Sequence, residues 1–332
     1  MAIRIDTKFK LNGYIESLIG GRSENQDSAG ALDTKIGTII TVCDGMGGLT
    51  GGKTASMIAV KTIIDDVASA DRYDDPKTVL TKAIIRANDA IIKAGEDDPD
   101  LRGMGTTVAA VIINKNYATV AHVGDSRVYQ LRGHKKVFRT NDHSQVFEQV
   151  KAGILTEEQA RTSSSSNVIL NALGLFDKVE PEIHKLPYIA GDRFLICSDG
   201  FWGALPENDF LALVTESGDI EEVIKNSCSE VNLIGIKTGS RHDNLTAAVF
   251  ELECDSKMKI PMKKSIKIIF LSIIALLVIS VILNIVTFNH NKAMRPVIKA
   301  TEAFRDNLAL ERDTTLCVKD FAKTIDSLSI KK

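Results

Sequence analysis

The chain has 332 residues, of which 44% are hydrophobic and 25% are charged, and this is the composition of an ordinary globular protein with one large or two medium domains. Its formal net charge of -2 excludes a general polyanion binder, because affinity for nucleic acid depends on clustered Lys and Arg side chains that neutralise phosphates. The five cysteines are widely spaced, which excludes a zinc-finger pattern, and we interpret the first four as reduced thiols.

The first ten residues contain no apolar run of the kind that a signal peptide has, so we expect this part of the chain to stay where it is synthesised. Farther along, short apolar runs rich in Ile, Val and Thr alternate with Gly turns and predict strands. Three of these strands follow one another closely, 105–114 with 117–123 and 127–131, which favours hairpins and antiparallel sheets over repeated βαβ units. Strands are expected at 36–43, 105–114, 117–123, 127–131, 192–198 and 244–252, and helices at 53–68, 77–94, 206–214 and 219–234.

Aspartates recur in short motifs along the same region, at tight Gly turns and at the ends of apolar runs. Carboxylate oxygens are the ligands that Mg²⁺ and Mn²⁺ prefer, and a strand end holds them in a fixed position. The sequence therefore predicts a site for divalent cations. The motifs, in chain order, are Arg22-Ser-Glu-Asn-Gln-Asp27, Asp44-Gly-Met-Gly-Gly48, Gly124-Asp-Ser-Arg127, Ser198-Asp-Gly200 and Asp243-Asn244.

In their order, these five motifs resemble the metal-dependent protein phosphatases of the 2C type, in their bacterial serine/threonine form. The resemblance covers roughly residues 11–252, and it lies in the set of motifs because no single one is specific. It implies an α+β fold in which two antiparallel β-sheets pack as a sandwich flanked by α-helices. It also implies a phosphatase that uses Mn²⁺ or Mg²⁺ as its cofactor.

The resemblance further implies a role for each aspartate. Asp44 would bridge two metal ions, and the carbonyl of Gly45 would help to hold the second ion. Asp199 and Asp243 would complete the shell of the first ion, whereas Asp27 would act mainly through bound water. A water clamped between the two ions would become acidic and attack the phosphorus in line.

Two further residues of these motifs and one additional segment extend this site. Asp125 resembles the residue that, with Asp199, holds a third and weaker metal ion in bacterial members of the family. Arg22 offers a planar guanidinium to the phosphate oxygens and would position the ester, so Arg22 joins Asp27 and Asp44 in the expected catalytic set. The segment Asp142-His143-Ser144 matches a family element that leads into a flap at about 145–168.

Two positions depart from the family pattern. Met46 replaces a histidine that is common in animal relatives, so metal-bound water or another group, for which His242 is a candidate, would protonate the leaving group. Lys53 replaces a common acidic residue and completes a segment with Walker A spacing at 47–54, so a P-loop-type nucleotidase is an alternative function. A catalytically inactive, membrane-tethered binding module is the other alternative. A P-loop protein requires a parallel sheet, and it leaves the remaining aspartate motifs without a role.

The segment 268–288 contains no charged residue, and about twenty residues at ~1.5 Å each match the ~30 Å hydrocarbon core of a bilayer. We therefore predict a transmembrane helix here. Lysines crowd the basic linker 254–267, so the positive-inside rule places the catalytic domain, 1–253, in the cytoplasm and a short tail, 289–332, outside the cell membrane.

Together these features predict a membrane-anchored phosphatase that removes phosphate from phosphoserine and phosphothreonine in proteins. Its expected partners are phosphorylated proteins, among them a cognate bacterial serine/threonine kinase and the substrates of that kinase, together with the membrane through the C-terminal helix. No nucleic acid is expected among them.

Overall fold

The computed structural model describes residues 1–5, 7, 9, 11–47, 51–237 and 242–259, and the isolated positions 276, 277, 303 and 324. The chain divides into two compact units, Met1–Ile260 and Pro261–Lys332. Apart from those isolated positions, the expected transmembrane helix at 268–288 and the tail lie outside the described residues. Within the described part of the chain, no helix is both long and apolar enough to cross a membrane.

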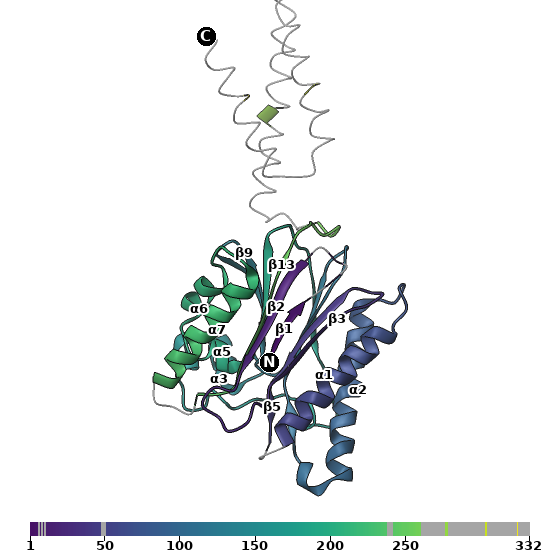
Figure 1. Cartoon of the computed structure of the whole chain (residues 1–332), viewed down its shortest axis with the longest axis vertical. Helices are drawn as coiled ribbons and strands as arrows, with labels where there is room; N and C mark the ends of the chain where they lie inside the picture. Colours follow the sequence, from purple (N-terminus) through teal and green to yellow (C-terminus); the bar gives the residue numbers. More distant parts are fainter. Residues whose placement is uncertain are drawn as a thin grey trace, which may run out of the picture. The chain divides into compact units, whose positions relative to one another are not determined.

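Two antiparallel sheets form the centre of the first unit (Figure 1). The larger sheet has the strand order β1 (Ala2–Ile5), β2 (Leu11–Leu18), β13 (Leu245–Leu252), β12 (Asp192–Cys197), β9 (Arg127–Arg132) and β10 (Lys135–Arg139). The other sheet has the order β11 (Glu182–Leu186), β8 (Ala118–Val123), β7 (Val108–Ile113), β4 (Thr38–Cys43) and β3 (Ser28–Asp33). A short ribbon pairs β5 (Gly45–Met46) with β6 (Gly105–Thr106).

Helices cover the outer face of each sheet (Figure 1). The long pair α1 (Gly51–Ser69) and α2 (Pro76–Asp97) packs on the five-stranded sheet, and the short 3₁₀ helix η1 (Pro99–Leu101) follows it. The six-stranded sheet is covered by α5 (Asp199–Trp202), α6 (Glu207–Val214) and α7 (Ile220–Lys237). Between the two groups in the chain lie α3 (Gln145–Lys151) and α4 (Glu157–Arg161).

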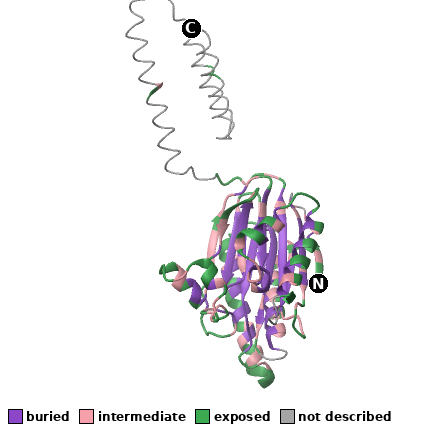
Figure 2. Cartoon of the chain, turned by 90° about the vertical axis from the view of Figure 1, so that its left-hand side faces the viewer, coloured by how far each residue is buried: buried purple, intermediate pink, exposed green. Residues whose placement is uncertain are grey.

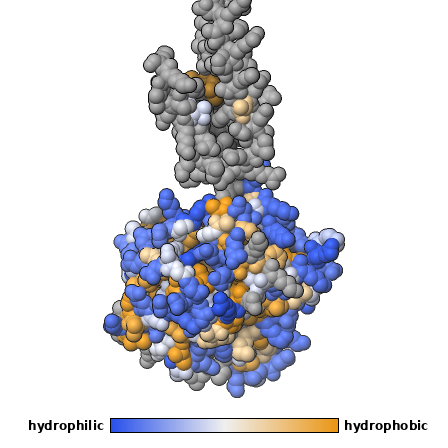
Figure 3. Space-filling model, turned by 45° about the horizontal axis from the view of Figure 1, so that its top comes forward, coloured by the Kyte–Doolittle hydropathy of each residue, from blue (hydrophilic) through white to orange (hydrophobic). Residues whose placement is uncertain are grey.

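Three clusters of buried apolar side chains hold these layers together. The first lies between the sheets and includes Ile40 and Phe250, the second joins the five-stranded sheet to α1 and α2 through Ile63, and the third joins the six-stranded sheet to α6 through Phe210. The sheets accordingly form the buried interior in Figure 2, and hydrophilic residues dominate the visible face of this unit in Figure 3. One face of the central strands β4 and β7 is covered by helices and the other by the opposite sheet. Both strands are therefore buried along their whole length and are almost continuously apolar.

The expected αββα architecture is confirmed, and the strands and helices expected from periodicity are found within a few residues. One expected strand pairing is wrong. β8 and β9 follow one another in the chain and were expected to pair, but they belong to different sheets. The chain crosses the sandwich at the turn between them, where Gly124 has a φ of 98°. Periodicity missed β1, β2, β3, β10 and β11, because they are short or carry polar residues that face solvent or the site.

Candidate metal centre

The five-stranded sheet brings two of the expected aspartates together. Asp44 directly follows β4, and Asp27 directly precedes β3. These strands are antiparallel neighbours in which Ser28 lies opposite Cys43, so the end of one strand meets the beginning of the other. Both carboxylates therefore stand at the same end of the sandwich.

The six-stranded sheet adds two more at that end. Asp199 follows β12 and Asp243 precedes β13, and these strands are also antiparallel neighbours. Ser198 links the two sheets, because its Oγ donates a hydrogen bond of 2.8 Å to Oδ2 of Asp27. The same oxygen accepts the backbone N–H of Thr246 at 3.0 Å. The Ser-Asp-Gly motif thus contributes a sheet-to-sheet link as well as a carboxylate.

Asn244 fixes the loop that carries Arg22 and Asp27. Its side-chain amide donates to the carbonyls of Ile19 and Glu24, both at 2.8 Å, and its Oδ1 accepts the N–H of Gln26 at 2.8 Å. No role for Asn244 was predicted from the sequence. Its place beside Asp243 in the motif was the signal that it belongs to the site.

Gly45 allows the backbone around Asp44 to pack closely. A Cβ at this position would lie 2.1 Å from the carbonyl oxygen of Gly52 at the start of α1 and 2.6 Å from that of Gln26, so a larger residue cannot be accommodated. Asp44 itself is held through its backbone, because its N–H donates to Oγ1 of Thr107 at 3.0 Å. Its side chain therefore projects from a fixed main chain.

Burial and mutual repulsion set the electrostatics of the cluster. Burial raises the pKa of Asp27 to about 6 and that of Asp199 to about 7, and repulsion from Asp243 adds to both shifts. Burial also raises the pKa of Asp44 well above its ordinary value, with repulsion from Asp27, Asp199, Asp125 and Asp243 in addition. Asp44 is thus repelled by each of the four other aspartates of the group.

Asp125 reaches this end of the sandwich because the turn between β8 and β9 crosses from one sheet to the other. It is 2% exposed, and burial raises its pKa well above the ordinary value, with repulsion from Asp199 as the next cause. Among the described residues, the Oδ1 atoms of Asp27, Asp125 and Asp199 are buried and have no hydrogen-bond partner. A set of crowded carboxylate oxygens without partners fits hard divalent cations, which bind oxygen and cancel the repulsion.

Arg22 lies at the exposed edge of this group. Its Nη2 donates to Oδ2 of Asp243 at 2.6 Å, and the two side chains are 44% and 37% exposed. The structure thus brings Arg22 to the cluster, as expected, but pairs it with an expected metal ligand. Met46 lies in β5 opposite Gly105, and its thioether has no proton to donate.

The two other residues singled out in the sequence have structural contacts. The ammonium of Lys53, in the first turn of α1, donates to the carbonyl of Asp27 at 2.9 Å and to Oγ of Ser28 at 3.3 Å. The two strands before this segment, β4 and β5, both pair antiparallel, which contradicts the P-loop alternative. His242 is buried against Gly235 of α7, and burial lowers its pKa.

Comparison with known proteins identifies this arrangement. The sequence model of the family "Protein phosphatase 2C" matches residues 16–228. The chain belongs to the protein phosphatase 2C family. It is 32% identical over 240 residues to the serine/threonine phosphatase Stp of Listeria monocytogenes, an alignment that covers 71% of this chain and 93% of that protein.

Solved structures of the family agree. The S. agalactiae serine/threonine phosphatase superposes with a TM-score of 0.66 at 32% identity and covers 73% of this chain and 100% of that one. The catalytic domain of the phosphatase PstP in complex with two manganese ions superposes with a TM-score of 0.63 at 30% identity, over 73% of this chain and 98% of that one.

This phosphatase 2C chain is thus a serine/threonine phosphatase, and its expected enzyme class and its Mn²⁺ or Mg²⁺ cofactor are confirmed. The roles of individual residues remain predictions.

Proposed function

We propose that this phosphatase hydrolyses phosphoserine and phosphothreonine in proteins with a water activated by two divalent metal ions. One observation carries the proposal: four aspartates from two sheets meet at one end of the sandwich, and some of the buried carboxylate oxygens there have no hydrogen-bond partner among the described residues. The oxygens in question are the Oδ1 atoms of Asp27 and Asp199 and, at the crossing turn, that of Asp125.

Each residue would contribute according to its place. Asp44, on which the other carboxylates act, would be shared by both ions, and the Gly45 carbonyl would support it. Asp199 and Asp243 would hold the first ion, while Asp27, tied to Ser198, would orient water. Bound Mn²⁺ or Mg²⁺ would supply an acidified water and stabilise charge on the phosphoryl group.

Two further groups would extend the site toward substrate and a third ion. Asp125, buried beside Asp199, would hold the additional and weaker ion. The exposed guanidinium of Arg22 would take the phosphoryl oxygens, and its pair with Asp243 would keep it beside the ions. Because Met46 has no proton to give, the leaving oxygen would take its proton from water.

We also propose that the enzyme opposes a bacterial serine/threonine kinase and acts at the cell membrane. The support for the kinase is the family to which the chain belongs. The support for the membrane is sequence alone: 268–288 has no charge, and lysines precede it in 254–267. This topology would place the catalytic unit in the cytoplasm and the tail, 289–332, outside.

The catalytic proposal is tested by phosphate release from a phosphothreonine peptide by the purified chain, with Mn²⁺ and with EDTA. We expect release that requires Mn²⁺, and no specific ATP binding by calorimetry. Lys53→Ala should retain hydrolysis within a few-fold, since the ammonium donates to the backbone carbonyl of Asp27 and the hydroxyl of Ser28 and to no carboxylate among the described residues. Tight ATP binding that disappears in Lys53→Ala would contradict the proposal.

The membrane proposal has a separate test. The full chain should stay with membranes after high-salt and carbonate washes. Cys317 is the only cysteine after 268–288, so an impermeant thiol reagent applied to intact cells should label it, and Cys317→Ser should abolish that label. Labelling that requires broken cells would place the tail in the cytoplasm and contradict the topology.

A further inference from the structure

The turn that carries Asp125 is held from several sides. Gly124 needs its positive φ of 98°, and a Cβ there would lie 2.7 Å from Cγ2 of Thr107. The indole N–H of Trp202 donates to the carbonyl of Asp125 at 3.0 Å, and the hydroxyls of Thr107 and Ser126 are 2.7 Å apart. The direction of the Asp125 carboxylate therefore depends on groups outside the turn.

His143 makes a two-way contact with Gly124, the residue before Asp125. The backbone N–H of His143 donates to the Gly124 carbonyl at 2.9 Å, and the Gly124 N–H donates to Nδ1 of the His143 ring at 3.3 Å. Since Nδ1 accepts a hydrogen bond, the proton of the neutral ring lies on Nε2. Burial lowers the pKa of His143, which keeps the ring neutral near pH 7.

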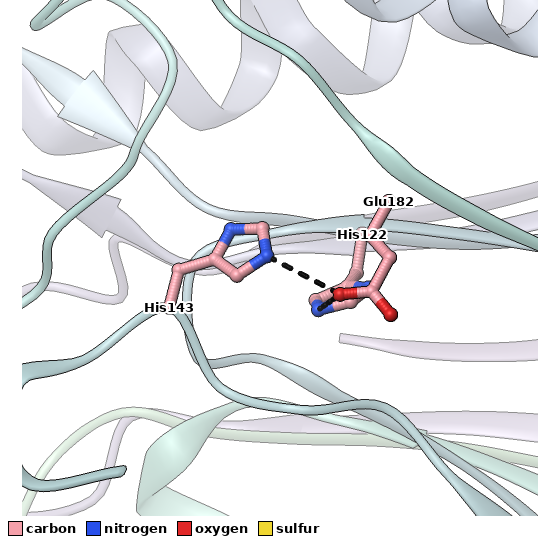
Figure 4. A group of neighbouring side chains, drawn as sticks. All are labelled: His122, His143 and Glu182. Atoms are coloured by element: carbon pink, nitrogen blue, oxygen red, sulfur yellow. Dashed lines mark ion pairs between the residues drawn. The ribbon is translucent and has the colours of Figure 1, made fainter. Parts of the chain in front are cut away.

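Glu182 faces the other side of this ring, as Figure 4 shows. It lies in β11 directly opposite His122 of β8, and its Oε2 is 3.7 Å from Nε2 of His143 and 4.0 Å from Nε2 of His122. The rings of His122 and His143 lie 4.6 Å apart between centroids. Glu182 is anchored in turn by Nε2 of His184 at 2.8 Å from its Oε1. The carboxylate of Glu182 thus lies beside Nε2 of His143, at the distance of an electrostatic contact.

These three side chains are close enough together to hold a metal ion, but their protons argue against one. His122 uses Nε2–H to donate to the carbonyl of Asn141 at 2.7 Å, and His143 carries its proton on Nε2 as well. A metal ion needs the lone pair of a deprotonated ring nitrogen. Both nitrogens that face Glu182 are already protonated, so the cluster is built to position a ring.

We propose that His143, oriented by Glu182, is a positioning residue that sets the direction of Asp125 through Gly124 and thereby the affinity of the third metal ion. The inference rests on the proposed function, because it requires that Asp125 hold an ion. Outer contacts of this kind change metal affinity by roughly 10–100-fold when they are removed. The effect belongs to metal affinity, since His143 touches neither the substrate arginine nor the central Asp44.

Two substitutions at His143 separate its two contacts. In His143→Asn, the side-chain oxygen can take the place of Nδ1 and accept the Gly124 N–H, but the side chain does not reach Glu182. In His143→Gln, the amide reaches the place of Nε2, and the Gly124 N–H loses its acceptor. Glu182→Gln is a third variant that leaves Gly124 untouched and removes the charge that His143 shares with His122 and His184.

The measurements are the Mn²⁺ concentration that gives half-maximal hydrolysis of a phosphothreonine peptide, kcat at saturating Mn²⁺, and Mn²⁺ binding by calorimetry. We expect His143→Gln to raise the half-maximal Mn²⁺ concentration roughly tenfold. His143→Asn should stay within about twofold of the wild type, and Glu182→Gln should shift in the same direction as His143→Gln by a smaller factor. In all three variants kcat at saturating Mn²⁺ should change little.

Equal shifts in His143→Asn and His143→Gln, or a loss of kcat at unchanged Mn²⁺ dependence, would overturn the inference. If His143→Gln does not fold, Glu182→Gln decides it, and an unchanged Mn²⁺ affinity there would count against the role. Failure of the proposed function is distinguishable, since the wild type would then show no Mn²⁺-dependent turnover. The calorimetric comparison of the variants would still report on Asp125.

Discussion

Asp142 and the aspartate cluster, both in the first unit, differ in what faces their carboxylates. Asp142 is 4% exposed on its side chain and meets Arg127 in a two-pronged pair, with hydrogen bonds of 2.8 and 2.6 Å. The guanidinium also stacks on Trp202, 3.5 Å from the ring centre. At the end of the sandwich, the buried Oδ1 atoms of Asp27 and Asp199 have no partner among the described residues. Burial raises the pKa values of both groups, and repulsion between carboxylates adds to the shift.

The difference separates a carboxylate that is paired within the fold from carboxylates that we propose to bind metal. A buried charge is costly unless a counter-charge meets it, so an unpaired group of acids makes the metal-free protein less stable. In Asp142 the counter-charge is a side chain of the same chain. In the aspartate cluster the counter-charge must come from a bound cation. Binding of the cation relieves the unfavourable energy of the unpaired charges, and this increases the affinity for metal.

Replacing the central ligand should have the largest effect. Asp44→Asn should lower Mn²⁺-supported turnover by more than about a hundredfold, because a direct ligand counts for more than an outer contact. Phosphopeptide kinetics measure the loss of turnover, and calorimetry measures the loss of Mn²⁺ binding. The same variant should melt at the same or a higher temperature than the wild type in EDTA, since repulsion is relieved. Near-normal rates at limiting Mn²⁺ would contradict the two-ion centre.

Breaking the internal pair should have the opposite consequence for stability. Asp142→Asn should lower the free energy of unfolding by about 3–5 kcal/mol, because Arg127 is left as an unpaired buried charge. Urea unfolding in EDTA measures this loss, and Asp44→Asn is the matched control. If the two variants lost equal stability in EDTA, the distinction between the two groups would fail.

Arg22 is intermediate between the two cases, because it pairs with an aspartate of the cluster, Asp243, but at an exposed edge. Arg22→Ala should raise KM for a phosphopeptide about tenfold, as expected for loss of a hydrogen bond to a charged group. Mn²⁺ affinity should stay equal or rise slightly, because Asp243 is released from its partner. A matched drop in Mn²⁺ affinity, measured by calorimetry, would make Arg22 a structural residue.

The smallest effect concerns pH in the metal-free protein. The folded-state pKa values of Asp27 and Asp199, about 6 and about 7, lie above the ordinary value of 3.8, so the folded state binds protons more tightly than the unfolded state. Their contribution to stability is complete below about pH 4 and is lost as the pH rises through 6 to 7. In EDTA, the midpoint of thermal unfolding should therefore fall by a few degrees between pH 5 and pH 8. Saturating Mn²⁺ should remove this fall, and a midpoint that rises with pH in EDTA would contradict the raised pKa values.

Much of this molecule could be read in advance from local patterns. Continuous apolar runs identified β4 and β7 because both faces of these strands are covered, and helical spacing identified α1 and α2. Periodicity failed for β11, whose Glu182 and His184 belong to a polar cluster, and it placed β8 and β9 side by side although they lie in different sheets. A periodic pattern reports which face of a strand is buried, and it carries no information about the neighbouring strand.

The sequence by itself located the aspartates that we propose to bind metal, because each aspartate of the cluster stands in a short motif at the end of an apolar strand or at a Gly turn. Only the tertiary structure decided how they meet. Ser198 reaches Asp27, and Asn244 holds the loop before it, across separations of 171 and 218 positions in the chain. The crossing at Gly124 brings Asp125 to the same end of the sandwich, where His143 holds the turn. Such contacts follow from strand order and sheet packing, which local residue patterns do not encode.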